Sequence, residues 1–363
     1  MALAPRSSVG RYTVSLDEAP GVRWRTVVDD HREAILKLVR SYIGQFEAEP
    51  GDGDFMKSLG KGLLEDLELG GMGGCRAELE WAAGWLGIPL YEMTLLHLAY
   101  ESVQEEMPDN PCGCTAIVTR MVENNICLAR TLDWDLDELK DLVIEVDVTR
   151  GGTQLYRCVT WAGYFGVLTA MTDHYAVAIN FRADGMDNCP PPGSLPVGFQ
   201  VRYALEQTTD YAAGLEYLKM AKLMAPAFVI LTDGKSRGCV VARGTSGVVA
   251  LRSLADIPEG EPEFLVQANM DVGDPEDVMD SVRRCEYVVR RVRHRHKAKK
   301  PCTEAFLWDM FQSKPIFDTD TVYTSQMDVA SGRMVTRLPS KNNKGESAGL
   351  SGRIRAWRDK KCT

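Results

Sequence analysis

Three residues that could support nucleophilic chemistry lie close together in the sequence. Cys114 offers a thiol, Arg130 a cation and Asp133 a carboxylate, all within twenty residues. Polar turn residues at Val122–Asn125 separate two strand-like runs, the second of which covers residues 126–134. Such a pattern predicts a hairpin that brings the two charged side chains back towards the thiol. A nucleophile flanked by charge is the chemistry that this spacing favours.

The thiol gains its own base if the chain is cut immediately before Cys114. A free α-amine has a reference pKa near ~8, so it can take a thiol proton close to neutral pH and later return it to a leaving nitrogen. No catalytic histidine is then required. The chain has only five histidines, and His294 and His296 lie in a basic run.

The pattern Cys-Thr-x-Ile-Val at Cys114, with Arg and Asp sixteen and nineteen positions later, resembles the acid ceramidase and N-acylethanolamine acid amidase family. These are N-terminal-nucleophile hydrolases, and the resemblance implies an α+β fold of the αββα sandwich type. The order and spacing of short matches over about 300 residues make it specific. The further matching segments are Val14–Asp17, Pro20, Arg23–Trp24, Gly87–Leu90, Glu92, Ala162–Gly166, Leu168–Thr169, Leu223–Leu231, Gly238–Val241, Arg243 and Thr321–Thr324.

The resemblance also implies a role for each matching residue. Cys114 would attack the amide carbonyl, while its freed amine acts as base and then as acid. Arg130 and Asp133 would hold the new terminus and set its protonation. Asn180 matches the asparagine of the family's Asn-Glu-Arg segment, and Asn269 matches the donor to the oxyanion. Loss of one such donor typically costs on the order of 3 kcal/mol of transition-state stabilisation.

Two positions depart from the family pattern. A further family arginine matches Arg283 or Arg284, with the spacing from Asn269 shifted by about one residue, and we take Arg283 as the expected site residue. Phe181 stands where the family has glutamate, which removes a carboxylate from the expected site, and Asp184 could substitute for it. The departure bears on self-cleavage and substrate preference more than on the class of chemistry.

Each candidate also has an interpretation without function. A lone cysteine at the start of an apolar strand is usually a small buried hydrophobe. A zinc site at Cys112 and Cys114 lacks a second ligand pair at suitable spacing, so we expect no metal and no cofactor. Arg130 and Asp133 could form a structural ion pair. The candidate asparagines could be turn residues, although both end apolar runs.

Composition agrees with a soluble enzyme. The chain has 363 residues, of which 45% are hydrophobic and 26% charged, enough for a sizeable core. It contains no apolar run of about 18 residues, and its first ten residues do not read as a signal sequence. We therefore expect a cytoplasmic location with most of the ten cysteines reduced, although Cys75 and Cys362 could pair in an exported protein.

The expected cut also organises the chain. Residues 1–113 form a mainly helical part, in which apolar residues recur at helical spacing over residues 24–105, interrupted by the Gly- and Asp-rich residues 50–53. Residues 114–339 form the catalytic part, with strands expected at 142–148, 156–161, 175–179, 228–231 and 238–242 and a helix over 202–220. Residues 340–363 are Lys-, Ser- and Gly-rich and predict a disordered tail.

A basic run lies between Arg283 and Lys300. Nine Lys or Arg residues and one glutamate give it a charge of +8, so the rest of the chain is near −17. A solvated face or loop is the leading interpretation. Docking to an anionic lipid surface is the functional alternative, worth about 1 kcal/mol per basic residue near a membrane. Nucleic-acid binding is disfavoured because only Tyr287 interleaves with the charge and the whole chain is acidic.

The family resemblance implies hydrolysis of the amide bond in fatty N-acyl lipids, and this is the function we predict. The match at Val14–Trp24 favours an N-acylethanolamine over ceramide as the substrate. We also expect the cleaved subunits to associate with each other. Ceramidase activity is the alternative, and bile-salt or penicillin-type amides are further options. A non-catalytic lipid-binding relative is the alternative from another class, motivated by Phe181.

Overall fold

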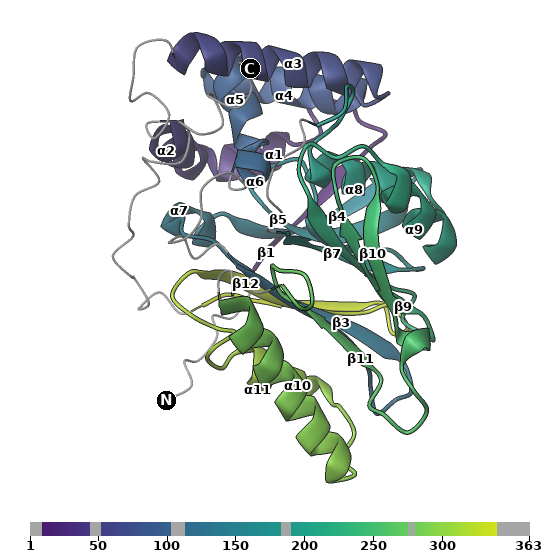
Figure 1. Ribbon diagram of the computed structural model, residues 1–363. Coiled ribbons are helices and arrows are strands. Elements are labelled where there is room, and N and C mark those ends of the chain that lie inside the picture. Colours follow the sequence, from purple (N-terminus) through teal and green to yellow (C-terminus); the bar gives the residue numbers. More distant parts are fainter. Residues whose placement is uncertain are drawn as a thin grey trace.

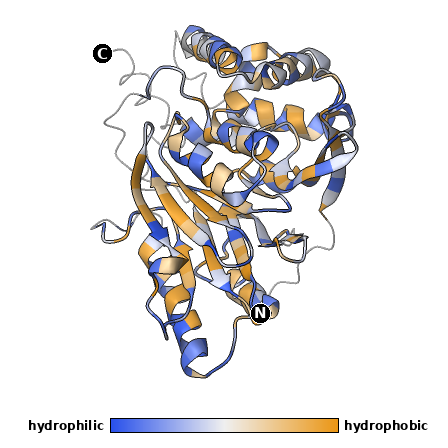
Figure 2. Ribbon diagram, turned by 90° about the vertical axis from the view of Figure 1, so that its right-hand side faces the viewer, coloured by the Kyte–Doolittle hydropathy of each residue, from blue (hydrophilic) through white to orange (hydrophobic). Residues whose placement is uncertain are grey.

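The computed structural model describes residues 9–43, 52–102, 113–182, 190–274, 277 and 280–339. These form four layers, in the order helices, sheet, sheet, helices (Figure 1). Apolar residues concentrate on the strands of the two sheets, whereas the outer helices carry polar residues on the side away from them (Figure 2). The αββα sandwich implied by the family resemblance is therefore confirmed.

The larger sheet has eight strands in the order β1-β4-β5-β6-β7-β8-β9-β10. Neighbouring strands are antiparallel, except that β1 pairs with β4 in parallel. β1 comes from the part of the chain that precedes Cys114, so this part contributes a strand as well as helices. The strands are β1 Gly10–Ser15, β4 Val143–Arg150, β5 Thr153–Trp161, β6 Thr169–Met171, β7 Ala176–Phe181, β8 Ala227–Thr232, β9 Gly238–Arg243 and β10 Val248–Ser253.

The smaller sheet has five strands in the order β11-β2-β3-β12-β13. Its centre is the predicted hairpin, in which β2 (Cys114–Arg120) pairs with β3 (Ile126–Asp133). Asn124 in the turn has a φ of 64°, a left-handed conformation that asparagine tolerates better than most residues. The other strands are β11 Phe264–Gln267, β12 Thr321–Asp328 and β13 Arg333–Arg337.

Helices cover the larger sheet on its outer face (Figure 1). Those that precede Cys114 bury the apolar residues that recur at helical spacing, among them Ile35, Leu38, Leu79 and Leu86. They are α1 Arg25–Asp30, α2 Arg32–Ile43, α3 Asp52–Leu69, α4 Gly73–Leu86, α5 Leu90–Leu96 and α6 Ala99–Ser102. The short α7 Asp137–Lys140 follows β3, and α8 Val197–Gln207 and α9 Tyr211–Met220 complete this layer.

The fourth layer consists of α10 (Ser281–Lys297) and α11 (Glu304–Phe311), which pack on the outer face of the smaller sheet. A separate cluster of buried apolar residues lies between them and the sheet, and Ile117, Val288 and Phe311 are fully buried in it. The main core fills the space between the two sheets and below the other helices. The basic run is therefore mostly helical, with one face against the protein.

Most of the expected strands are confirmed, but the helix expected over residues 202–220 is wrong. Two helices occupy this region, because the Asp210 side chain accepts a hydrogen bond from the Ala213 amide and starts a second helix there. The expectations for Cys112, Asp184, Cys362 and the tail fall outside the described residues, as does part of the break at residues 50–53. No described helix has the length and apolarity needed to cross a membrane.

Candidate active site

Cys114 is the first residue of β2 and is almost completely buried between the two sheets. In the hairpin register Cys114 lies opposite Leu132, and Arg130 lies opposite Ala116. Residues two apart on a strand share a face, so Arg130 is a diagonal neighbour of Cys114 on the same side of the sheet. Arg130 Nη2 donates to Cys114 Sγ at 3.2 Å. The hairpin therefore brings the Arg130 cation next to the Cys114 thiol, as predicted.

The Arg130 guanidinium is held on several sides. It is fully buried, and Nη1 donates to Thr169 Oγ1 and to the Tyr323 hydroxyl, both at 2.6 Å. Besides the thiol, Nη2 donates to the Ile179 carbonyl at 2.7 Å. These contacts come from three different strands and leave the side chain little freedom. The guanidinium is therefore a fixed cation in hydrogen-bond contact with the sulfur.

The backbone of Cys114 is held by Asn269 and Arg284. The Cys114 amide donates to Asn269 Oδ1 at 2.7 Å, and Arg284 Nη1 donates to the Cys114 carbonyl at 2.6 Å. Arg284 Nη2 also donates to Asn269 Oδ1 at 2.7 Å, which orients that amide. Gly113 passes so close that an added Cβ would lie 3.2 Å from the guanidinium. A larger residue at this position would require the Arg284 guanidinium to shift by a few tenths of an ångström.

Arg284, and not Arg283, is the arginine of this site. The Arg283 side chain is 70% exposed and lies 3.5 Å from Asp280. The two neighbours point in different directions because they lie on a helix, where consecutive residues are about 100° apart. The expectation for Arg283 is therefore corrected. Periodicity could have found Arg284, since Val288 and Val292 follow it at four-residue spacing and mark the buried face.

Asp133 lies next to the peptide bond that precedes Cys114. Its amide donates to the Gly113 carbonyl at 2.8 Å, and its carboxylate Oδ1 accepts from Thr321 Oγ1 at 2.7 Å. Burial, assisted by Asp318, raises the pKa of Asp133 to about 8, against the opposing effects of Arg284, Thr321 and Arg130. The side chain is thus a neutral acid at acidic pH. The Arg130 guanidinium donates to Thr169, Tyr323, Cys114 and Ile179. Among the described residues no ion pair joins it to Asp133, so the interpretation of these two residues as a structural ion pair is not supported.

Asn180 is close to the site but does not direct its amide nitrogen at the thiol. Its Nδ2 donates to the Gln267 carbonyl at 2.9 Å, which ties β7 to the end of β11. Its Oδ1 is buried and has no hydrogen-bond partner. Its carbonyl accepts from the Tyr100 hydroxyl at 3.1 Å. Asn180 therefore offers the site an acceptor rather than a donor.

Phe181 is buried at the end of β7, and its ring meets that of Tyr100 edge-on with the centroids 6.3 Å apart. Its carbonyl accepts a hydrogen bond of 2.9 Å from Asn269 Nδ2. An amide nitrogen carries two hydrogens, so Asn269 can donate to Phe181 and to an oxyanion at once. The apolar ring makes this corner of the site hydrophobic where the family has a carboxylate.

Thr169, Tyr323 and Tyr100 were not expected as site residues. Thr169 and Tyr323 lie within segments that carry the family resemblance, but their roles in holding Arg130 depend on pairing between strands that are distant in sequence. Tyr100 comes from α6, before the nucleophile. No sequence signal indicated that this helix reaches the site. Among the described residues, no group of three His, Cys, Asp or Glu side chains is arranged to hold a metal ion.

The chain is similar to known amide hydrolases. No family model matches the chain. It is 28% identical to an acid ceramidase of Bos taurus, over 92% of this chain and 87% of that protein. It is also 28% identical to an N-acylethanolamine-hydrolyzing acid amidase of Caenorhabditis elegans, over 72% of this chain and 74% of that one. An uncharacterized mimivirus protein is 26% identical over 76% of this chain.

A solved structure similar to this one belongs to the same group of proteins as the sequence relatives. The Caenorhabditis elegans N-acylethanolamine-hydrolyzing acid amidase ortholog superposes with a TM-score of 0.50 and 26% identity, covering 60% of this chain and 93% of that chain. The alignment with the acid ceramidase covers 92% of this chain, so it includes residues on both sides of Cys114. The chain is therefore a homologue of acid ceramidases and N-acylethanolamine-hydrolyzing acid amidases, a group of amide hydrolases, and has the N-terminal-nucleophile hydrolase fold.

Proposed function

We propose that this protein hydrolyses the amide bond of fatty N-acyl lipids with Cys114 as an N-terminal nucleophile, which self-cleavage of the Gly113–Cys114 bond exposes. The observation that supports this most strongly is the environment of that peptide bond. Its carbonyl accepts from the Asp133 amide, the Cys114 amide donates to Asn269, and the thiol accepts from Arg130. The Gly113–Cys114 peptide bond is thus fixed through its carbonyl oxygen and its amide nitrogen. This arrangement, with Arg130 beside the thiol, suits attack of the thiol on that bond.

Self-cleavage begins when the Cys114 thiolate attacks the Gly113 carbonyl carbon. The Asp133 amide donates to the oxygen that becomes the oxyanion. The C–N bond then breaks, the Cys114 nitrogen takes up a proton, and a thioester links Gly113 to Sγ. Asp133, whose pKa is about 8, supplies that proton at acidic and neutral pH. Water then hydrolyses the thioester to the Gly113 carboxylate and the free thiol.

The mature site repeats this chemistry on a substrate. The new α-amine takes the thiol proton, and Sγ attacks the acyl carbonyl while Asn269 Nδ2 donates to the oxyanion. The amine then returns the proton to the departing nitrogen, and water releases the fatty acid from the thioester. Arg284 keeps Asn269 oriented throughout, and the unpartnered Asn180 Oδ1 can accept from an N–H group in the site.

The two pieces formed by the cut would remain associated. β1 pairs with β4 along six residues, although they lie on opposite sides of the cut. Glu101 Oε1 accepts from the Val197 amide at 2.8 Å, and the buried Glu78 pairs with Arg202. A shared sheet and core make separation as costly as unfolding.

An N-acylethanolamine is the substrate we favour over ceramide. The support is the sequence match at Val14–Trp24 and the name of the Caenorhabditis elegans relative. Acid ceramidases among the relatives keep ceramide as the second candidate. N-palmitoylethanolamine and N-palmitoylsphingosine share the acyl chain and differ in the amine. The ratio of their kcat/KM values would therefore measure the preference for the amine alone. A higher kcat/KM for the sphingosine amide would reverse our choice.

Intact mass under denaturing, reducing conditions tests the proposal first. Self-cleavage of the 40.3 kDa chain predicts pieces of roughly 12 and 28 kDa, the larger beginning at Cys114. Cys114→Ala should remain whole, whereas Cys75→Ala, which removes another buried thiol, should still be cut. A wild-type chain that stays whole between pH 4 and pH 8 yet binds N-acyl lipids would favour the non-catalytic alternative.

The basic run forms a cationic stripe on α10. Arg283, Arg290, Arg293 and Lys297 are exposed and lie seven, three and four residues apart, on a helix face that also carries Glu286. Arg284 belongs to the active site instead, so it does not contribute to this stripe. A row of cations on one helix face complements a surface of anionic headgroups. We propose that the stripe docks the enzyme on anionic lipid, where its substrates would lie.

Sedimentation with vesicles of phosphatidylcholine, with and without phosphatidylserine, tests the stripe. Binding should require phosphatidylserine and weaken as salt rises. Arg290→Glu with Arg293→Glu should abolish it. Lys37→Glu with Arg40→Glu on α2 changes the net charge equally and should retain it. Equal loss in both double variants would indicate an effect of total charge and contradict the stripe.

A further inference from the structure

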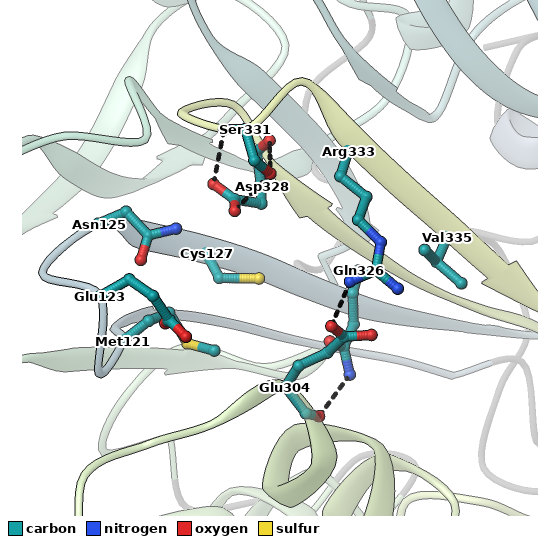
Figure 3. A pocket seen from close by; sticks show the side chains of 10 residues that line it. All are labelled: Met121, Glu123, Asn125, Cys127, Glu304, Gln326, Asp328, Ser331, Arg333 and Val335. Carbon is teal, nitrogen blue, oxygen red and sulfur yellow. Dashed lines mark hydrogen bonds and ion pairs between the residues drawn. The ribbon is translucent and has the colours of Figure 1, made fainter.

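A cavity of about 260 Å³ lies at the far end of the β2–β3 hairpin from Cys114 (Figure 3). The hairpin turn, β12, β13 and the start of α11 surround it. Cys114 and Arg120 are the first and last residues of β2, so about 20 Å of strand separates the thiol from this end. The cavity is therefore distinct from the proposed active site.

Two hydrogen-bond acceptors in the cavity wall have no donor. Gln326 is 4% exposed, and its Nε2 donates to the Glu304 carbonyl at 3.4 Å, which sets the orientation of the amide. Its Oε1 is buried without a partner, and so is Oδ1 of Asn125. Both residues line the cavity. Buried acceptors without donors are unfavourable in a folded protein, so a ligand that supplies N–H groups would satisfy both.

The cavity is also anionic. Glu123, Glu304 and Asp328 line it, and Arg333, which lines it too, donates to the Glu304 carboxylate. Burial, assisted by these three carboxylates, raises the pKa of the Cys127 thiol between them. In the part of the chain that the structure describes, no ion pair to Glu123 or Asp328 is found, although Ser331 donates to the Asp328 carboxylate. Two carboxylates therefore lack a counter-charge.

A metal ion is a poor match for these groups. The structure shows no arrangement of three His, Cys, Asp or Glu side chains, among the residues it describes, that could hold one metal. The unsatisfied groups are instead neutral amide oxygens and separate carboxylates. Ammonium groups carry both the charge and the N–H donors that these acceptors lack.

We propose that this cavity binds a small primary diamine, with its ammonium groups accepted by Glu123 and Asp328 and by the free amide oxygens of Gln326 and Asn125. The cavity is slightly smaller than the roughly 300 Å³ at which sites for drug-sized ligands begin, which suits a small ligand, and it has apolar side chains, Met121 and Val335, for the alkyl segment. This site does not depend on the proposed amidase activity. Its ligand recognition uses charge and N–H donors together.

Isothermal titration calorimetry with 1,4-diaminobutane tests the proposal on the full-length protein. The matched probe is the permethylated analogue with two quaternary ammonium groups, which has the same charge and no N–H donor. Saturable binding of the diamine, at least tenfold tighter than of the quaternary analogue at equal ionic strength, is expected. No binding at millimolar concentration, or equal binding of the two compounds, would overturn the proposal.

Variants separate the cavity from other acidic sites. Glu123→Gln changes an exposed side chain and should weaken diamine binding at least fivefold, whereas Glu259→Gln, an exposed glutamate elsewhere, should leave it unchanged. Gln326→Met removes the buried acceptor, so it should weaken binding and also preserve or raise the melting temperature without ligand. Unchanged affinity in Glu123→Gln and Gln326→Met would place the diamine outside this cavity.

Discussion

The two ends of the β2–β3 hairpin have opposite chemistry. At the Cys114 end, the buried Arg130 donates to the Cys114 thiol, and the buried Arg284 donates to the Cys114 carbonyl and to Asn269. At the turn end, acidic and amide side chains line a cavity, and two buried amide oxygens among them have no donor. The first end is already organised by the protein's own contacts, as catalysis of a fixed bond requires. The second is left incomplete, as a site for an exchangeable ligand would be.

Replacing Arg130 should have the largest effect. Arg130→Leu removes the cation from the thiol and takes the Arg130 donor from Thr169 and Tyr323, which are left with their hydrogen bond to each other. We expect amide hydrolysis and self-cleavage to fall by about 10³-fold, and the melting temperature to drop. Rates on N-palmitoylethanolamine and intact mass over time would measure both reactions.

Arg130→Lys sharpens this test. Lysine keeps the charge but is a single ammonium and cannot span the same four acceptors. A lysine variant with wild-type rates would show that charge alone suffices and that the fixed geometry at this end of the hairpin is not needed.

Asn269→Ala should have the next largest effect. It removes the acceptor of the Cys114 amide and the donor proposed for the oxyanion, so kcat should fall by about 10² to 10³-fold. KM should change far less, because the lost interaction belongs to the transition state. The kcat and KM values on one N-acyl substrate would decide. A rise in KM with unchanged kcat would place Asn269 in substrate binding instead.

Arg284→Lys should lower the rate less, by roughly tenfold to a hundredfold, since lysine cannot bridge the Cys114 carbonyl and Asn269 together. The adjacent Arg283→Ala provides the matched control, because that side chain is exposed and, among the described residues, forms its ion pair with Asp280 on the surface. It should retain activity within about twofold on a substrate presented without anionic lipid, so that the proposed docking role of Arg283 does not enter the comparison. Equal losses in the two variants would contradict the separation of these neighbours by the helix.

The contrast between Arg283 and Arg284 also shows where sequence reasoning succeeds and where it fails. The hairpin was predictable because strand alternation and turn residues are local, and it brought Arg130 and Asp133 to Cys114 as expected. Choosing between two adjacent arginines required knowing which face of α10 is buried. Motif spacing alone, shifted by one residue, does not contain that information.

Features that depend on distant pairing were not accessible from the sequence. Tyr323 and Thr169 hold Arg130 only because β12 and β6 lie beside it in space. β1 joined the larger sheet although the first part of the chain was expected to be mainly helical. The cavity is formed by strands and a helix from three separate segments, so no single motif could have indicated it.

Glu101 offers the smallest and most specific test, through the pH dependence of stability. Burial raises the pKa of Glu101 to about 8, so the folded protein keeps a proton that the unfolded chain, with an ordinary carboxyl pKa, releases from about pH 4.5 upward. The stabilisation is fully present below that pH and is lost as the pH rises towards 8. The melting temperature should therefore fall over this interval, and Asp133 adds to the same trend.

Glu101→Gln should reduce this slope, because the amide stays neutral and its oxygen can still accept from the Val197 amide. Part of the slope should remain, owing to Asp133. Glu123→Gln removes a carboxylate at the other end of the hairpin, where the side chain is exposed, and should leave the slope unchanged. Melting temperatures between pH 4.5 and pH 8 would measure all three proteins. If the Glu101 variant kept the wild-type slope, the Glu101 carboxyl would be ionised in the folded protein, which would contradict its raised pKa.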